Sequence, residues 1–66
     1  MNKIDIETII EATYWYAGDF GFELPDEFYE FYDNIEEASE EQLLDFYEQY
    51  SDTMMDLDEA LYYLNE

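Results

Sequence analysis

The chain has 66 residues, with 20 aspartates and glutamates against one lysine and neither cysteine nor histidine, so its formal net charge is −19. This length allows one small domain, residues 1-66, close to the lower limit for burying a sufficient core without disulfides or metals. The missing cysteine and histidine exclude disulfides, zinc-thiolate sites and the commonest catalytic nucleophile and base, so we expect no enzyme, no catalytic residue and no cofactor.

The apolar content indicates a folded domain and not an acidic disordered tail. Hydrophobic residues make up 48% of the chain and aromatic residues 21%, and each aromatic side chain buries a large area. No apolar run approaches the ~20 residues that span a bilayer, and the N-terminal residues lack the basic and apolar regions of a signal peptide. We therefore expect a folded cytoplasmic protein with no membrane partner.

The isoleucine-rich stretch that begins at Asp5 predicts a first helix. We expect Asp5 as its N-cap, Ile4 packed against Ile9 across the first turn, and Gly18 as the C-terminal stop. Residues at helical spacing predict its buried face: Ile6, Ile9, Ile10, Thr13 and Ala17. We also expect Trp15 in the core, whereas Glu7 and Glu11 lie on another side.

The segment from Gly18 to Leu24 contains both glycines and predicts the principal loop. Its apolar residues alternate, which indicates a short extended piece held against the core by Phe20, Phe22 and Leu24. Pro25 predicts the start of a second helix, with Asp26 and Glu27 in the first turn at the positive end of the helix dipole. Its predicted core stripe is Phe28, Phe31, Tyr32 and Ile35.

Two capping signals predict two further helices. Ser39 and Gln42 form a capping box, with Ala38 and Leu43 placed as the accompanying hydrophobic contact. Asp56 and Glu59 form a second capping box. The residues expected to face inward are Leu43, Phe46, Tyr47 and Tyr50 in the third helix and Leu57, Ala60, Leu61 and Leu64 in the fourth. The predicted fold is a single small all-α domain of three to four short helices.

The acidic run from Asp56 to Glu59 also suggests a calcium-binding loop. An EF-hand loop that starts at Asp56 needs glycine at its sixth position, where this chain has Leu61. The helix cap is the better interpretation, and we expect no specific metal site.

The residues from 26 to 52 carry carboxylates at helical spacing and no basic residue. We expect these carboxylates to lie outside the core and to bind a partner, and we name them the acidic band: Asp26, Glu27, Glu30, Asp33, Glu37, Glu40, Glu41, Asp45, Glu48 and Asp52. Tyr29 and Leu44 are the candidate apolar contacts among them.

The charge density of the chain is close to that of DNA. B-form DNA carries one charge per ~1.7 Å, so 19 charges correspond to about 32 Å of duplex. A compact domain of this length has a radius of gyration near ~11 Å and is roughly 28 Å across. Because self-repulsion destabilises a compact chain, folding alone does not favour this charge.

Three interpretations of the acidic band are open. A solvated surface normally mixes both signs of charge, which this chain does not. Adaptation to high salt explains the charge but does not call for the high aromatic content. Imitation of a phosphate backbone explains carboxylates on short helices, because they would meet the Lys and Arg side chains that otherwise meet DNA.

The segments Ile35–Tyr47 (IEEASEEQLLDFY) and Asp56–Leu61 (DLDEAL) resemble the acidic helical middle portion of ArdA antirestriction proteins. In overall character the chain is similar to the small acidic DNA-mimic proteins with which phages and mobile elements inhibit restriction enzymes, CRISPR nucleases or uracil-DNA glycosylase. The resemblance implies a non-enzymatic inhibitor encoded by a phage or mobile element and acting in the host cytoplasm.

We therefore expect a DNA mimic that occupies the groove of a basic DNA- or RNA-binding protein and does not itself bind nucleic acid. The alternative is an acidic adaptor that binds a basic partner without imitating DNA; an apolar groove with charges at its rim would favour it. The many aromatic residues slightly favour a homodimer, which the repulsion between two chains of charge −19 opposes.

Overall fold

The computed structural model describes residues 2–65. Within that range the chain forms four α-helices and one short 3₁₀ helix, with no strand. The elements are α1 (Lys3–Phe20), α2 (Asp26–Asp33), η1 (Ile35–Glu37), α3 (Glu40–Gln49) and α4 (Leu57–Leu64). The predicted all-α class is confirmed.

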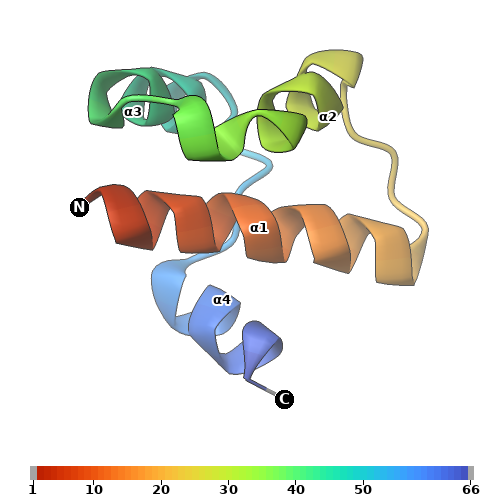
Figure 1. Cartoon of the computed structure of the whole chain (residues 1–66). Helices are drawn as coiled ribbons and strands as arrows, with labels where there is room; N and C mark the ends of the chain where they lie inside the picture. The colour runs from red at the N-terminus through yellow and green to blue at the C-terminus, as the bar shows by residue number, and fades with distance from the viewer. Residues whose placement is uncertain (1, 66) are drawn as a thin grey trace.

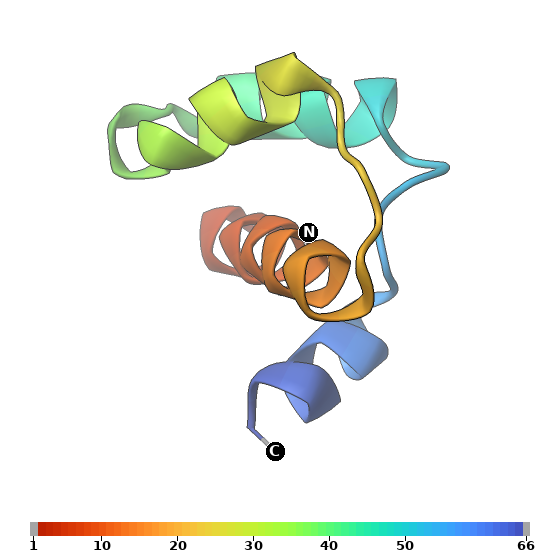
Figure 2. The same ribbon diagram turned by 90° about the vertical axis from the view of Figure 1, so that its right-hand side faces the viewer.

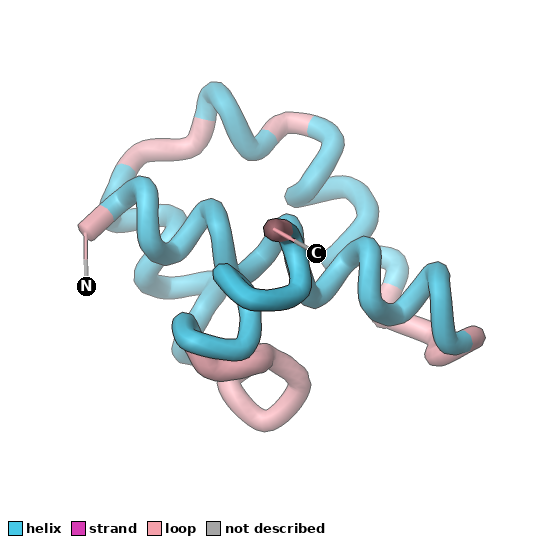
Figure 3. Tube along the Cα trace, turned by 90° about the horizontal axis from the view of Figure 1, so that it is seen from below, coloured by secondary structure: helices cyan, strands magenta, loops and turns pink. Residues whose placement is uncertain are grey.

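Helix α1 is the central element, and the other helices pack on its two sides. Helices α2 and α3 lie on one side of α1, and α4 lies on the other (Figures 1 and 2). Viewed from the α4 side, short loops join the helices around α1 (Figure 3). The molecule therefore presents the outer surfaces of α2 and α3 on one side and the outer surface of α4 on the other.

Helix α1 begins earlier than the sequence predicted. Asn2 is the N-cap, and its side-chain oxygen accepts a hydrogen bond of 2.8 Å from the backbone N–H of Asp5. The predicted N-cap at Asp5 is wrong because Asn2 is an equally good cap three residues earlier. Asp5 therefore lies in the first turn, and Ile4 is exposed, so the predicted contact of Ile4 with Ile9 is also wrong.

Helix α1 also ends later, because Gly18 does not stop it. The helix continues to Phe20, and Gly21 ends it in the left-handed conformation with φ 76° while its N–H donates to the carbonyl oxygen of Ala17. Phe20 is thus helical, and both Phe20 and Phe22 are exposed. Of the predicted extended piece, only Leu24 is held in the core.

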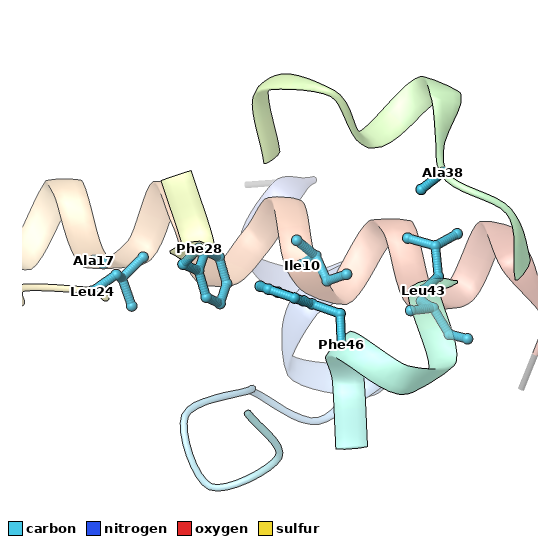
Figure 4. Close-up of a cluster of buried hydrophobic side chains, with 8 residues drawn as sticks. Ile10, Ala17, Leu24, Phe28, Ala38, Leu43 and Phe46 are labelled. Carbon is cyan, nitrogen blue, oxygen red and sulfur yellow. The ribbon is translucent and has the colours of Figure 1, made fainter. Parts of the chain in front are cut away.

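Two apolar clusters hold the helices together. The larger one joins α1 to α2 and α3, and Figure 4 shows Phe28, Leu43 and Phe46 beside Ile10. Its buried residues are Ile6, Ile10, Ala17, Leu24, Phe28, Ala38, Leu43 and Phe46. The smaller cluster, between α1 and α4, consists of Ile9, Ala12 and Ala60. All the residues of the predicted buried face of α1 are buried, but they are divided between two sides of the helix and do not form one face.

The capping box at the start of α3 is confirmed. Ser39 Oγ accepts a hydrogen bond of 3.2 Å from the backbone N–H of Gln42, and Gln42 Oε1 accepts one of 2.9 Å from the N–H of Ser39. Helix α2 begins after Pro25, as predicted. Asp56 occupies the N-cap position of α4, but its side chain makes no capping hydrogen bond, so the second capping box does not form.

Several residues predicted to be core lie at the surface. Trp15 is 50% exposed, and Leu61 and Leu64 are exposed as well. Leu61 and Leu64 are exposed because α4 packs chiefly against α1, through the face that carries Ala60. Helical spacing predicts a common face but not whether a neighbour covers it.

Candidate functional site

Every carboxylate of the acidic band is exposed, as predicted, and α2 and α3 carry most of them. Neither helix contains a basic residue. The lysine of the chain, Lys3, lies in α1, where its Nζ is 3.9 Å from Oε1 of Glu7. The band therefore presents negative charge that no basic side chain of this protein neutralises.

A groove of about 540 Å³ runs between α2, η1 and α3, and we name it the α2–α3 groove. The rings of Phe31 and Phe46 stack in it, with centroids 4.1 Å apart and an interplanar angle of 3°. The groove is also lined by polar and further apolar side chains: Glu27, Glu30, Asn34, Glu37, Ala38, Gln42, Gln49 and Tyr50. It therefore combines aromatic surface with carboxylates from α2 and η1.

The groove brings together only part of the acidic band. Glu27, Glu30 and Glu37 line it. The remaining predicted carboxylates are exposed elsewhere on the surface: Asp26, Asp33, Glu40, Glu41, Asp45, Glu48 and Asp52.

The two predicted apolar contacts have different surroundings. Tyr29 is 39% exposed, but its ring packs edge-on against Tyr14 with centroids 5.8 Å apart, and its hydroxyl accepts a hydrogen bond of 3.4 Å from the N–H of Leu24. Tyr29 therefore has a structural role as well as an exposed edge. Leu44 is exposed, and neither residue lines the α2–α3 groove.

The acidic surface also includes residues of α1 and η1 that the sequence pattern did not assign to the acidic band. Glu7, Glu11 and Glu36 line a cavity of about 150 Å³ together with Tyr32 and Ile35. Glu7 and Glu11 were expected on another side of the first helix than its apolar face, and α1 places them beside η1. Their spacing of four residues puts them on one helix face, and only the packing of η1 over α1 shows which neighbour that face meets.

The pKa of the Tyr32 phenol is raised in this environment. Burial is the main reason that the pKa of the Tyr32 phenol lies above its ordinary value, and the negative charges of Glu11 and Asp33 raise it further. The neutral phenol is therefore the stable form, and the cavity adds no further charge at neutral pH.

The described residues form neither a metal-binding cluster nor a membrane-spanning helix. No group of three or more acidic side chains among residues 2–65 is placed to hold a metal ion. None of the helices formed by these residues is both long and apolar enough to cross a membrane.

The overall dimensions agree with those expected from the chain length. The radius of gyration is 10.9 Å, and the principal extents are 28 × 24 × 20 Å. Dividing the 28 Å length by the 19 net charges gives one charge per about 1.5 Å, close to the ~1.7 Å of duplex DNA.

No protein family, curated protein or solved structure matches the chain. The resemblance to ArdA proteins and other DNA mimics therefore stays a prediction from the sequence pattern.

Proposed function

We propose that the protein is a DNA-mimic inhibitor that occupies the basic groove of a DNA- or RNA-binding protein. The observation that carries this proposal is the acidic band itself, a set of exposed carboxylates on α2 and α3 with no basic side chain among them. A molecule whose charge per unit length is close to that of a duplex presents comparable negative charge to a basic groove.

The physical advantage for the inhibitor is electrostatic. Lys and Arg side chains that neutralise phosphates would neutralise these carboxylates instead, and the negative field would steer association. The extension of the acidic surface onto Glu7, Glu11 and Glu36 gives the mimic a second side from which basic residues can approach. A host defence nuclease or a DNA repair enzyme is the class of target that the resemblance to phage inhibitors implies.

A second candidate function has its own support. The α2–α3 groove has a stacked Phe31–Phe46 pair in its interior and carboxylates among its lining residues. This is the arrangement expected of an acidic adaptor, which anchors an apolar side chain of a basic partner and surrounds it with charge. The two functions differ in whether the bound partner can still bind DNA.

The test is a competition experiment with a labelled duplex and three representative targets: a restriction endonuclease, a CRISPR nuclease and a uracil-DNA glycosylase. A DNA mimic displaces the duplex from at least one of them, and its affinity for that target falls about tenfold or more between about 50 mM and 200 mM salt. The variant Glu30→Lys, Asp33→Lys, Glu41→Lys should lose the inhibition while its circular dichroism stays helical.

A matched control separates the band from net charge. The variant Glu23→Lys, Asp58→Lys, Glu59→Lys carries the same change of charge at exposed positions outside the band, in the loop before α2 and in α4. It should retain most of the inhibition. Glu7 and Glu11 are unsuitable controls because they lie beside η1.

A complex that still binds the duplex with unchanged affinity would contradict DNA mimicry and favour the adaptor. In that case Phe31→Leu, which breaks the stacked pair in the α2–α3 groove, should weaken the complex more than the charge reversals do while its circular dichroism stays helical, because apolar anchors carry most of the binding energy in such interfaces.

A further inference from the structure

The C-terminal half of α1, the residues just after it and α4 carry a cluster of exposed and half-buried aromatic side chains. We name it the aromatic face and define it by Trp15, Tyr16, Phe20, Phe22, Tyr62 and Tyr63. Phe20 is 62% exposed and Tyr62 is 71% exposed. The second half of α1, the residues just after it and α4 contribute these rings, with α4 opposite to α2 and α3 (Figure 2).

The ring of Tyr16 packs against three other rings of the aromatic face. The Tyr16 ring lies 4.5 Å from that of Phe20, 5.8 Å from that of Phe22 and 5.7 Å from that of Tyr63, measured between centroids. The hydroxyl of Tyr63 donates a hydrogen bond to the Asp19 carboxylate, which ties α4 to the last turn of α1. Tyr16, Phe20, Phe22 and Tyr63 are therefore preorganised, and these four side chains would lose little freedom when a ligand binds.

Two cavities open on this face and share Tyr16, Tyr62 and Tyr63. The first, of about 610 Å³, also contacts Trp15, Phe20 and the carboxylate-bearing Asp19. The second, of about 350 Å³, is completed by Met55, Asp58 and Glu59. Both cavities thus combine aromatic walls with at least one acidic side chain.

Aromatic walls beside a carboxylate favour a ligand that carries a cation next to apolar groups. The face of an aromatic ring attracts a cation, and a planar guanidinium both stacks on rings and forms paired hydrogen bonds with a carboxylate. Asp19 lies in the first cavity and Asp58 and Glu59 in the second, so each cavity offers a carboxylate next to ring faces.

A second copy of this chain fits the face poorly. Its one lysine, Lys3, lies at the opposite end of α1 from the aromatic face and pairs with Glu7. A contact between two aromatic faces would bring Asp19, Asp58 and Glu59 of both copies together with no cation between them. Like charges that lose water in this way disfavour the contact.

We propose that the aromatic face binds an arginine-bearing amphipathic helix of another protein. Apolar side chains of that helix cover the rings of Trp15, Phe20 and Tyr62, and its guanidinium groups enter the two cavities beside Asp19, Asp58 and Glu59. Helix α4 lies across α1 from α2 and α3, which carry most of the acidic band, so the site goes beyond the proposed DNA mimicry and can be occupied at the same time.

The probe is a short synthetic helical peptide with leucines on one face and arginines beside them. The chain contains one tryptophan, Trp15, and its side chain lines the first cavity, so its emission responds to a peptide bound there. At about 0.15 M salt, where long-range attraction is screened, the peptide should bind saturably and shift the emission to shorter wavelength. A peptide with the same arginines but serine in place of leucine should bind about tenfold more weakly or worse.

Two variants locate the binding site. Phe20→Ala with Tyr62→Ala removes the two most exposed rings of the face and should weaken peptide binding about tenfold or more. The control, Ile4→Ala, removes an exposed apolar side chain in the first turn of α1 and should leave the affinity unchanged. Circular dichroism establishes that both variants stay folded.

Three results would overturn the proposal. The first is that neither peptide binds, or that both bind equally well. The second is that Phe20→Ala with Tyr62→Ala binds normally while Glu30→Lys, Asp33→Lys, Glu41→Lys does not, which would assign the peptide to the acidic band. The third is that light scattering of the protein alone gives a dimer that Phe20→Ala with Tyr62→Ala dissociates, which would make a second copy the occupant. Duplex competition measures the proposed function separately.

Discussion

Thr13 is the buried polar side chain of the described residues, and its hydroxyl shows how one residue joins two elements. The hydroxyl donates to the carbonyl oxygen of Ile9 at 2.8 Å and accepts a hydrogen bond of 3.3 Å from the backbone N–H of Met55. An unpaired buried hydroxyl would cost stability. Here both hydrogen bonds form, and the second fixes the segment that precedes α4 against α1.

Tyr63 provides a prediction about alkaline pH. Its hydrogen bond to the Asp19 carboxylate favours the neutral phenol and raises the pKa of Tyr63 from 10.0 to about 12. The stabilisation is therefore complete below pH 10 and is lost as the pH rises to about 12. Thermal unfolding should show that Tyr63→Phe lacks this part of the alkaline loss of stability.

A spectroscopic measurement checks the same assignment. Ultraviolet titration of the phenols should show that the last step, near pH 12, becomes smaller in Tyr63→Phe. Tyr62→Phe is the matched control, because Tyr62 is the neighbouring exposed tyrosine and makes no such hydrogen bond in the described structure. Identical titration of the wild type and Tyr63→Phe would contradict the role of Asp19.

At the scale of the element, α1 makes opposite predictions for its two glycines. Gly18 lies within the helix, and a Cβ there would meet no atom within 4 Å. Gly18→Ala should therefore raise the free energy of unfolding by about 0.5–1 kcal/mol. Gly21 has φ 76°, so Gly21→Ala should lower it by about 1–2 kcal/mol.

Urea unfolding of the two variants measures both changes in one experiment. Because each variant adds the same methyl group at an exposed position, each serves as the control for the other. Destabilisation by Gly18→Ala would place the end of α1 at Gly18 after all.

At the scale of the whole molecule, repulsion between carboxylates limits stability. Two charges 20 Å apart in water repel by about 0.2 kcal/mol, and a molecule 28 Å long with 19 net charges contains many such pairs. Salt shortens the Debye length from about 30 Å at 0.01 M to about 10 Å at 0.1 M. The free energy of unfolding should therefore rise over this range by on the order of 1 kcal/mol or more.

Urea midpoints at increasing sodium chloride concentration measure this effect. In Glu30→Lys, Asp33→Lys, Glu41→Lys each reversal changes the charge by two units, so the net charge falls from −19 to about −13. Its stability should depend less on salt than that of the wild type. Equal dependence in both proteins would mean that the acidic band does not dominate the repulsion.

Local patterns in the sequence determined the helical class, the capping box at Ser39 and the exposure of the acidic band. These features depend on interactions within a few residues, namely a cap, helical spacing and the solvation of charge. The ends of α1 were predicted wrongly because Asn2 and Asp5, like Gly18 and Gly21, carry the same local signals, and only the complete helix selects between them.

Only the tertiary structure decided which surfaces these helices make. It placed Glu27, Glu30 and Glu37 around one groove, brought Glu7 and Glu11 beside η1, and left Trp15, Leu61 and Leu64 exposed. An apolar stripe is buried only where another element covers it, and α4 packs chiefly against α1. The aromatic face follows from that packing, because the positions of its rings in the sequence do not show which of them a neighbouring helix covers.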